Sequence, residues 1–344
     1  MSIQKIFKTI EMKYKSQYFS GLCFNSLKCK KDNIFFAIKG TKINGNKFIE
    51  HAIKKGAKII ISNQKFEGVK KKVLFIRSSN VRKSLSEFAY ALYKDKPRNI
   101  IAVTGTNGKS SVADFYFQIL KLNKKKVASI GTLGIKTKSY IKKVSNTTLD
   151  PIALSICLNK LKKENINDVI LEASSHGLKQ NRLDGLKFKA GIFTNLSHDH
   201  LDYHKTIDNY FESKLYLFKE LLMKDASIIT DREILQYKKI KSIALKKNYN
   251  IETISNKNGG LEIISHKHQN EKQIIKIRYN RNTYEFETRL IGRIQIKNIL
   301  MAMIAATKSG LSFKKIVNTI DNVKPISGRL EQIGVIKNNS KVIL

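Results

Sequence analysis

Residues 99–120 read NIIAVTGTNGKSSVADFYFQIL: an apolar run, a loop with two glycines and a stretch with apolar residues at helical spacing. This order predicts a strand, a turn and a helix. Gly105 and Gly108 allow backbone N–H groups to turn toward an anion. Lys109 can then reach the outer phosphates of a nucleotide, and the Ser110 hydroxyl can bind Mg²⁺. Because a helix N-terminus also attracts anions, the stretch predicts a nucleotide site rather than a chance glycine turn.

The length and composition indicate a globular chain of two or three domains. The chain has 344 residues, of which 42% are hydrophobic, enough for ordinary cores. Its cysteines (Cys23, Cys29 and Cys157) are odd in number and lack the spacing of a zinc site, which indicates a reducing compartment. No apolar stretch is long enough to span a bilayer, so we predict a cytoplasmic protein without membrane contact.

The formal charge of +38 at pH 7 suggests a nucleic-acid partner, because basic surfaces release counterions from phosphates. The lysines are spread along the whole chain, however, and no stretch interleaves arginine with aromatic residues as a single-strand-binding surface does. We therefore predict no nucleic-acid partner and a general attraction for acidic small molecules. A nucleic-acid-stimulated NTPase stays open as an alternative, with a steep salt dependence as its signature.

The pattern of apolar residues predicts an α/β protein. Residues 1–96 alternate short strands and helices and form a small N-terminal α/β domain, which ends at a polar linker before Pro97. Residues 97–326 continue the alternation, which is typical of a doubly wound parallel sheet with its site at the carboxyl ends of the strands. The candidate parallel strands are 100–103, 126–130, 168–171, 190–194 and 226–230. Between 250 and 291 the apolar period changes to two, which predicts an antiparallel extension with a turn at 258–260.

Two further clusters of polar residues follow predicted strands. Glu172 comes directly after the strand 168–171, where a phosphate-loop enzyme holds its metal, because Mg²⁺ prefers hard oxygen ligands. Residues 195–204 read NLSHDHLDYH and resemble the metal-binding signature of binuclear zinc hydrolases, although Tyr203 breaks the spacing by one residue. A zinc hydrolase therefore stays open as a second alternative, and within this run we assign a metal role only to His200.

Together these motifs resemble the Mur ligases, the ATP-dependent enzymes that build the peptide stem of bacterial peptidoglycan. The resemblance runs from about residue 22 to the end of the chain and includes GTNGKS at 105–110, NTT at 146–148, EASSHGL at 172–178, DHLDYH at 199–204 and SGRLE at 327–331. Within the family the motifs are most similar to the members that add the third stem residue. Another Mur-type or folylpolyglutamate-type ligase stays open as an alternative.

The resemblance implies roles for individual residues. Lys109, Glu172, His200 and Lys214 would be catalytic. The ATP phosphates would be held by Thr106, Asn107, Gly108, Lys109, Ser110 and Ser111, and residues near the nucleotide would be Asn298 and Arg329. The metal would be bound by Ser110, Glu172, His200 and Lys214. The muramoyl-dipeptide would contact Asn146, Thr147, Thr148, Ser174, Gln180 and Arg182, and the uridine nucleotide would face Ser26, Thr41, Lys42 and Ile43.

Lys214 lies in a helical pattern with few charges, and the pattern alone indicates an ordinary surface lysine. The resemblance implies instead that Lys214 carries CO₂ as a carbamate. Burial lowers the pKa of a lysine and leaves it partly neutral, and a neutral amine can add CO₂. The product is an oxygen-bearing anion that can help to hold Mg²⁺.

The implied activity is amide ligation with ATP and Mg²⁺ as cofactors. UDP-MurNAc-L-Ala-D-Glu would be phosphorylated on its carboxylate, and the amine of a diamino acid would attack the acyl phosphate. Residues 327–344 would begin a third, Rossmann-like domain, which supplies the acceptor site in the family. We expect a monomer that binds ATP and the UDP-sugar weakly and does not complete ligation without the rest of that domain. The sequence leaves open whether diaminopimelate or lysine is added.

Overall fold

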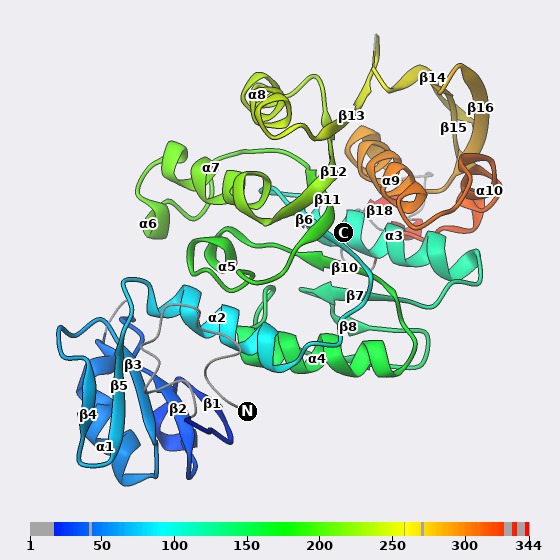
Figure 1. Cartoon of the computed structure of the whole chain (residues 1–344). Coiled ribbons are helices and arrows are strands. Elements are labelled where there is room, and N and C mark those ends of the chain that lie inside the picture. Colours follow the sequence, from blue (N-terminus) through cyan, green and yellow to red (C-terminus); the bar gives the residue numbers. More distant parts are fainter. Residues whose placement is uncertain are drawn as a thin grey trace. The chain divides into compact units, whose positions relative to one another are not determined.

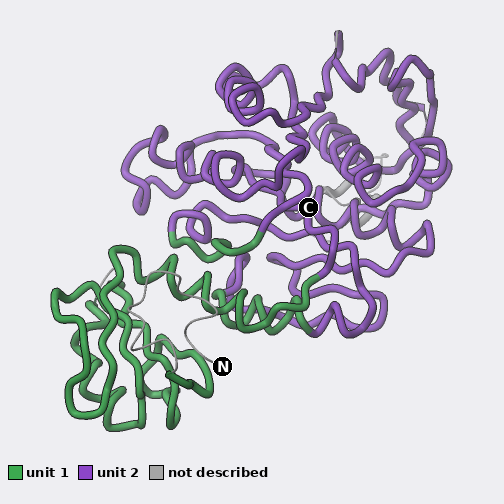
Figure 2. The backbone as a smooth tube through the Cα atoms, in the orientation of Figure 1, with its two compact units in different colours: residues 1–96, 150–159, 180–186 green, residues 97–149, 160–179, 187–344 purple. Residues whose placement is uncertain are grey.

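The computed structural model describes residues 17–40, 43–257, 259–269, 272–326, 332–335 and 341–343. The chain divides into two compact units (Figure 2): unit 1 contains residues 1–96, 150–159 and 180–186, and unit 2 contains residues 97–149, 160–179 and 187–344. The segments 150–159 and 180–186 thus belong to unit 1, whereas our division by sequence left them in the central domain. The functional assignment of the domains stays a prediction.

Unit 1 is an α/β layer structure. Its elements are β1 (Gly21–Cys23), η3 (Ser26–Lys28), β2 (Asn33–Phe36), η4 (Gly45–Phe48), α1 (Ile49–Lys54), β3 (Ile59–Ser62), β4 (Gly68–Lys70), β5 (Val73–Arg77) and α2 (Val81–Leu92). The described strands form a sheet of order β1-β2-β3-β5-β4, in which only the edge strand β4 is antiparallel to its neighbour. Successive side chains of β2 face opposite layers. Ile34 and Phe36 share a core with Phe88 of α2, whereas Phe35 shares one with Ala52 of α1.

Unit 2 is built on one large sheet (Figure 1). Its strands are β6 (Asn99–Thr104), β7 (Val127–Gly131), β8 (Gly134–Lys136), β9 (Ile141–Lys142), β10 (Asp168–Glu172), β11 (Phe188–Phe193), β12 (Leu222–Asp231), β13 (Asn250–Ser255), β14 (Leu261–Gln269), β15 (Lys272–Tyr279) and β16 (Asn282–Thr288). Their order is β16-β15-β14-β13-β12-β11-β6-β10-β7-β8-β9. The strands from β13 to β7 run parallel, which confirms the predicted class with a parallel sheet. A separate antiparallel pair consists of β17 (Gln332–Val335) and β18 (Lys341–Ile343).

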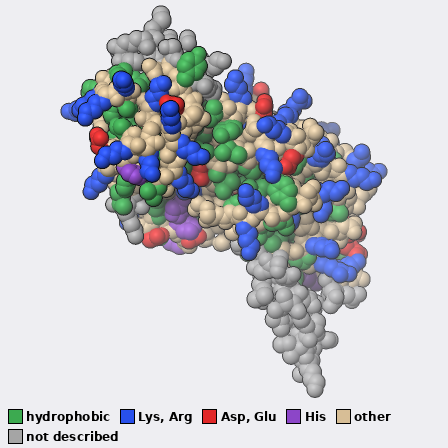
Figure 3. Space-filling view, turned by 90° about the horizontal axis from the view of Figure 1, so that it is seen from below, with side chains coloured by type: hydrophobic (Ala, Val, Ile, Leu, Met, Phe, Trp, Pro, Cys, Tyr) green, Lys and Arg blue, Asp and Glu red, His purple; other side chains and the backbone are tan. Residues whose placement is uncertain are grey.

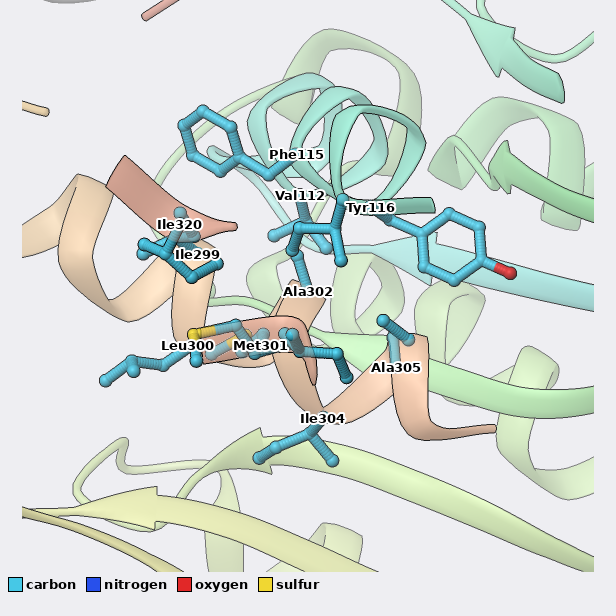
Figure 4. Packing of buried hydrophobic residues seen from close by; sticks show 14 of the residues in the cluster. Val112, Phe115, Tyr116, Ile299, Leu300, Met301, Ala302, Ile304, Ala305 and Ile320 are labelled. Carbon is cyan, nitrogen blue, oxygen red and sulfur yellow. The ribbon is translucent and has the colours of Figure 1, made fainter. Parts of the chain in front are cut away.

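Helices cover both faces of the large sheet. The helices are α3 (Lys109–Leu122), α4 (Pro151–Lys163, shared between the units), α5 (Ser175–Lys179), α6 (Leu201–His204), α7 (Ile207–Tyr216), η5 (Leu217–Leu221), α8 (Tyr237–Lys247), α9 (Gly292–Thr307), α10 (Phe313–Val317) and η6 (Ile320–Asn322). Ile192 of β11 joins the core formed with α3 and α9, whereas the adjacent Gly191 faces Phe218 of η5. Figure 4 shows the α3–α9 contact, with Val112 of α3 close to Ala302 of α9. The doubly wound arrangement predicted from sequence is thus confirmed.

The strand order reverses at β6. From β6 the chain continues to β7 and β10 on one side, and then to β11, β12 and β13 on the other. The carboxyl ends of β6, β10 and β11 are therefore neighbours, with Glu172 beside Val103 and Phe193 beside Thr104. Open α/β sheets bind ligands at such a point, outside the carboxyl ends of the strands. The glycine loop that follows Thr104 lies at this point.

The antiparallel extension predicted for residues 250–291 begins later than expected. β13 pairs in parallel with β12 and, over a short stretch, with β14; antiparallel pairing links β14 to β15 and β15 to β16. The turn predicted at 258–260, of which residue 258 lies outside the described residues, therefore does not close an antiparallel hairpin. Asn280 and Arg281 close the β15–β16 hairpin with φ values of 48° and 67°. An apolar period of two occurs in parallel and antiparallel strands alike, so it could not separate them.

Lys and Arg side chains are distributed over the face shown in Figure 3, among hydrophobic and acidic side chains. They do not gather there into a single basic patch. In the part of the chain that the structure describes, no helix has the length and apolar character needed to cross a membrane. The expected absence of a nucleic-acid partner stays a prediction.

Candidate functional site

A cavity of about 230 Å³ lies at the point where the strand order of unit 2 reverses. It is lined by residues from the glycine loop, from the ends of β7 and β10 and from the segments around α5, α6 and α7: Thr106, Asn107, Gly108, Lys109, Ser110, Ser111, Thr132, Thr147, Glu172, Ser174, Ser175, His200, Tyr210 and Lys214. The structure thus brings together the whole predicted phosphate loop and all of the residues predicted to be catalytic. The lining residues span more than 100 positions of the chain, from Thr106 to Lys214, and the strand order brings them to one edge of the sheet.

Two glycines with positive φ shape the loop between β6 and α3. Gly105 (φ 148°) and Gly108 (φ 85°) adopt backbone conformations that other residues rarely reach. Gly108 is the N-cap of α3, so the loop leads into a helix N-terminus, whose N–H groups and dipole attract anions. Lys109 Nζ donates to the carbonyl oxygens of Gly105 (3.0 Å) and Thr106 (2.8 Å). Its ammonium therefore rests on the loop that would hold phosphates.

Glu172 is the buried acid of the cavity. Its Oε1 accepts a hydrogen bond from the Thr132 N–H (2.8 Å), and its Oε2 accepts from the hydroxyls of Ser110 (3.1 Å) and Thr132 (3.2 Å). Burial raises the pKa of the Glu172 carboxyl, and the Thr132 N–H and the Lys109 ammonium oppose this shift. A Cβ at Gly131 would overlap Glu172 Oε1, so only glycine leaves room for the carboxylate in this position. Together the carboxylate and hydroxyls are hard oxygen donors of the kind that suits Mg²⁺.

Lys214 is buried against the glycine loop between β6 and α3, with 1% of its surface exposed. Its Nζ donates to Gly105 O at 2.7 Å and lies 4.1 Å from the centre of the Tyr210 ring. Burial, together with the positive charge of Lys109, lowers the pKa of the Lys214 ammonium to about 6. The amine is therefore largely neutral at pH 7 and above. The interpretation of Lys214 as a surface lysine, which its sequence pattern alone favoured, is wrong because α7 turns this side chain inward.

Three histidines lie near the cavity. His200 has a left-handed backbone (φ 52°), and its ring centre lies 5.0 Å from that of His176. His204 is buried beside Tyr210, and burial, with the positive charges around it, lowers its pKa to about 4. Among the described residues, no three His, Cys, Asp or Glu side chains are grouped so that they could hold a metal ion. This arrangement does not fit a binuclear zinc site, whereas Mg²⁺ needs few protein ligands when nucleotide phosphates supply others.

The predicted muramoyl-dipeptide residues of unit 2 lie at or beside the cavity. Thr147 and Ser174 line it, and Asn146 is exposed on the same loop as Thr147. The Thr148 hydroxyl donates to the carbonyl oxygen of Glu172 (2.8 Å) and bonds to the Ser174 hydroxyl (3.0 Å). The Thr148 hydroxyl is therefore placed to orient the Ser174 side chain beside the cavity. The predicted contacts of Asn146, Thr147, Thr148 and Ser174 with a substrate stay predictions.

The remaining predicted contacts lie elsewhere. In unit 1, Gln180 Oε1 accepts from the Arg182 guanidinium at 2.9 Å, Ser26 is buried in η3, and Ile43 is exposed. Asn298 is buried in α9, and a Cβ at Gly108 would lie 2.6 Å from Asn298 Oδ1, so Asn298 packs against the loop rather than lining the cavity. The predicted residues that lie outside the described residues are Thr41, Lys42 and Arg329.

Some cavity residues received no role in the sequence analysis. Thr132 follows β7 directly, and Tyr210 donates its hydroxyl to Thr106 Oγ1 at 3.3 Å. Thr132 carried one usable signal, because it stands at the carboxyl end of a predicted parallel strand. Tyr210 carried none, since aromatic residues on a helix are more often core.

Comparison with known proteins gives matches along most of the chain. The protein-family model of the Mur ligase middle domain matches residues 103–306, and the one described as "Mur ligase family, catalytic domain" matches residues 18–94. A protein of Rickettsia conorii named UDP-N-acetylmuramoyl-L-alanyl-D-glutamate--2,6-diaminopimelate ligase is 37% identical over 317 residues, which cover 91% of this chain and 66% of the relative. A protein of the same name from Zymomonas mobilis is 34% identical over 324 residues, which cover 94% of this chain and 66% of the relative.

Solved structures give a similar result. A structure of a ligase with the same name superposes with a TM-score of 0.86 at 26% identity and covers 98% of this chain and 69% of its own. The structure of the MurF ligase from Thermotoga maritima in complex with ADP superposes with a TM-score of 0.62 at 16% identity, which shows a shared fold, and covers 91% of this chain and 68% of its own. The chain spans 66% of the length of the relatives from Rickettsia conorii and Zymomonas mobilis.

Proposed function

The chain belongs to the Mur ligase family, and from this premise we propose that it carries the ATP and muramoyl-nucleotide sites of an amide ligase of peptidoglycan synthesis. The proposed reaction adds a diamino acid, the third stem residue, to UDP-MurNAc-L-Ala-D-Glu, the substrate class named for the relatives. The single observation that carries the proposal is the convergence of the phosphate loop, Glu172 and Lys214 on one cavity. The dependence on ATP and on a UDP-linked precursor leads us to propose a cytoplasmic reaction.

The cavity is suited to the phosphates of ATP. The N-terminus of α3 and the Lys109 ammonium supply positive charge on one wall. Binding of ATP would exchange the bonds of Lys109 to the Gly105 and Thr106 carbonyls for bonds to phosphate oxygens, which are stronger because both partners are charged. Mg²⁺ would be held by Ser110, Glu172 and His200, and it would neutralise charge on the phosphate oxygens.

The proposed chemistry has two steps. A carboxylate oxygen of the muramoyl-dipeptide attacks the γ-phosphorus of ATP, the bond to the bridging oxygen breaks, and ADP leaves. The amine of the diamino acid then attacks the acyl carbon and loses a proton, and phosphate leaves as the amide forms. The residues of this chain bind and orient the reactants and neutralise charge, because phosphoryl transfer needs little covalent participation from the protein.

We further propose that Lys214 is carbamylated. The observation that supports this is the buried amine, largely neutral at pH 7, within the cavity. A neutral amine adds CO₂ with loss of one proton, and the resulting anion would supply oxygen ligands beside Glu172 and His200.

An acyl-phosphate trap tests the proposed function. The chain is incubated with Mg-ATP, UDP-MurNAc-L-Ala-D-Glu and hydroxylamine, which converts an acyl phosphate into a stable hydroxamate. We expect ADP and hydroxamate in equal amounts, and neither product with UDP-MurNAc-L-Ala or with the Lys109→Ala variant. ATP hydrolysis that depends on nucleic acid and ignores the muramoyl-dipeptide would instead support the NTPase alternative. No hydroxamate with the intact substrate would refute activation of the carboxylate by this chain.

A further inference from the structure

The segment that follows β11 bonds to the centre of the phosphate loop. Asn195 Oδ1 accepts from the Asn107 N–H at 3.0 Å, and Asn195 Nδ2 donates to Asn107 O at 3.2 Å. The Thr106 N–H donates to the Asn195 carbonyl oxygen at 2.9 Å. One amide side chain therefore satisfies both main-chain polar groups of Asn107, the residue between the two glycines of the loop.

Thr194 strengthens the same contact. Its hydroxyl donates to Asn107 O at 2.6 Å, so this carbonyl accepts from both Thr194 and Asn195. A Cβ at Gly105 would overlap the Thr194 hydroxyl, which means that the two segments approach this closely only because residue 105 is glycine. The Ser197 N–H adds a bond to Thr106 Oγ1 at 3.0 Å.

These bonds determine the direction of the peptide unit between Asn107 and Gly108. In a trans peptide the C=O and the following N–H point in opposite directions. Since the Asn107 C=O points at Thr194 and Asn195, the Gly108 N–H points away from that segment. The Asn107 N–H is already bonded to Asn195 Oδ1. A bound anion is therefore left to the N–H groups from Gly108 onward, which open α3.

We propose that Asn195 is a positioning residue for nucleotide binding, which holds the Asn107–Gly108 peptide so that the Gly108 N–H faces the phosphates. Gly108 has φ 85° and no Cβ, so its backbone has several accessible conformations once the restraint is lost. The inference rests on the proposed function in one respect, that the ligand of the loop is a nucleoside triphosphate.

Calorimetric titration with Mg-ATP and with UDP-MurNAc-L-Ala-D-Glu tests the proposal. Asn195→Ala removes both side-chain bonds, and we expect the affinity for Mg-ATP to fall about tenfold. Asn195→Asp keeps an acceptor for the Asn107 N–H but cannot donate to Asn107 O, so we expect at least the same loss. Neither variant should change the affinity for the UDP-sugar, which a general loss of structure would lower as well.

Three further variants sharpen the comparison. Asn123→Ala is the matched control, because Asn123 Nδ2 also donates to a main-chain carbonyl, that of Ile119 (2.9 Å), at the opposite end of α3; it should leave both affinities unchanged. Thr194→Val removes the second donor to Asn107 O and should weaken Mg-ATP several-fold, whereas Thr194→Ser should not. This pair keeps the test decisive should Asn195→Ala fail to fold.

The role of Asn195 would be overturned if the folded Asn195→Ala variant bound Mg-ATP with wild-type affinity. It would also be overturned if the variant lost the same affinity for Mg-ATP and for the UDP-sugar. A wild-type chain that takes up no Mg-ATP would instead overturn the proposed function, and the two failures are therefore distinguishable.

Discussion

Lys214→Met should stabilise unit 2 at neutral pH, in buffer depleted of CO₂. The wild-type lysine is 1% exposed, and its pKa falls from 10.5 to about 6, chiefly through burial. At a pH between these two pKa values, Lys214 holds a proton in the unfolded chain but not in the folded protein. The free energy of unfolding therefore rises with pH across this range. The buried lysine costs the most stability at the low-pH end of the range. Methionine is of similar length and carries no charge to desolvate.

The magnitude follows from the distance between the working pH and the unfolded pKa. Each pH unit is worth about 1.4 kcal/mol, so at pH 7.5 the wild-type lysine costs about 4 kcal/mol. The variant also loses the hydrogen bond from Lys214 to Gly105 O, which is worth about 1 kcal/mol. We therefore expect Lys214→Met to raise the free energy of unfolding by about 3 kcal/mol at pH 7.5 and by less at pH 9.

Urea titrations at several pH values between 6.5 and 9 measure this difference. The matched control is Lys187→Met, because Lys187 also donates to a main-chain carbonyl, that of Glu220 (2.7 Å), but does so at the surface. Because the Lys187 side chain lies at the surface, the control should not reproduce the gain in stability expected of Lys214→Met. A Lys214→Met variant less stable than wild type across the range, or a difference that does not shrink as the pH rises, would refute the account of a buried, largely neutral lysine.

Two other substitutions test separate parts of the structure. Gly131→Ala places a methyl group where Glu172 Oε1 lies, so the carboxylate must move and its three hydrogen bonds are disturbed. We expect Mg-ATP affinity to fall about tenfold or more, with a loss of about 1–3 kcal/mol in stability, and unchanged affinity would contradict the assigned position of Glu172. Tyr116→Phe removes the buried hydroxyl that bonds to Ser309 Oγ at 2.6 Å; Tyr116 lies in α3 but does not line the cavity. We expect a loss of about 1–2 kcal/mol in urea titrations with normal Mg-ATP binding, and full stability in the variant would show that this hydrogen bond contributes nothing net.

Much of the fold could be predicted from local patterns. The apolar runs near β6, β7 and β10 lie within a residue or two of the observed strands, because each strand is buried and bounded by polar residues. The order of the strands could not be predicted in the same way. The placement of β6 between β10 and β11 depends on pairing between distant segments, and the parallel pairing of β13 leaves no mark on its apolar period.

In the candidate site, too, some residues could be predicted from local patterns and others could not. Lys109 and Glu172 could be found because each lies in a motif directly after a predicted strand. Asn195 also follows a strand, but its partner Asn107 is 88 positions away, and no local signal links the two residues. For Lys214 the local sequence pattern predicted the wrong environment. The pattern indicated an exposed lysine, whereas the packing of α7 buries the amine. Sequence reasoning thus misses residues whose role depends on which strands lie side by side in the sheet.

The most direct measurement of the central claim is the calorimetric titration of the chain with Mg-ATP, in parallel with Lys109→Ala. The claim is that the glycine loop at the carboxyl end of β6 binds the phosphates of a nucleotide. It predicts saturable uptake of about one Mg-ATP per wild-type chain and uptake at least tenfold weaker in the variant. No uptake by the folded wild-type chain, or equal uptake by Lys109→Ala, would contradict it.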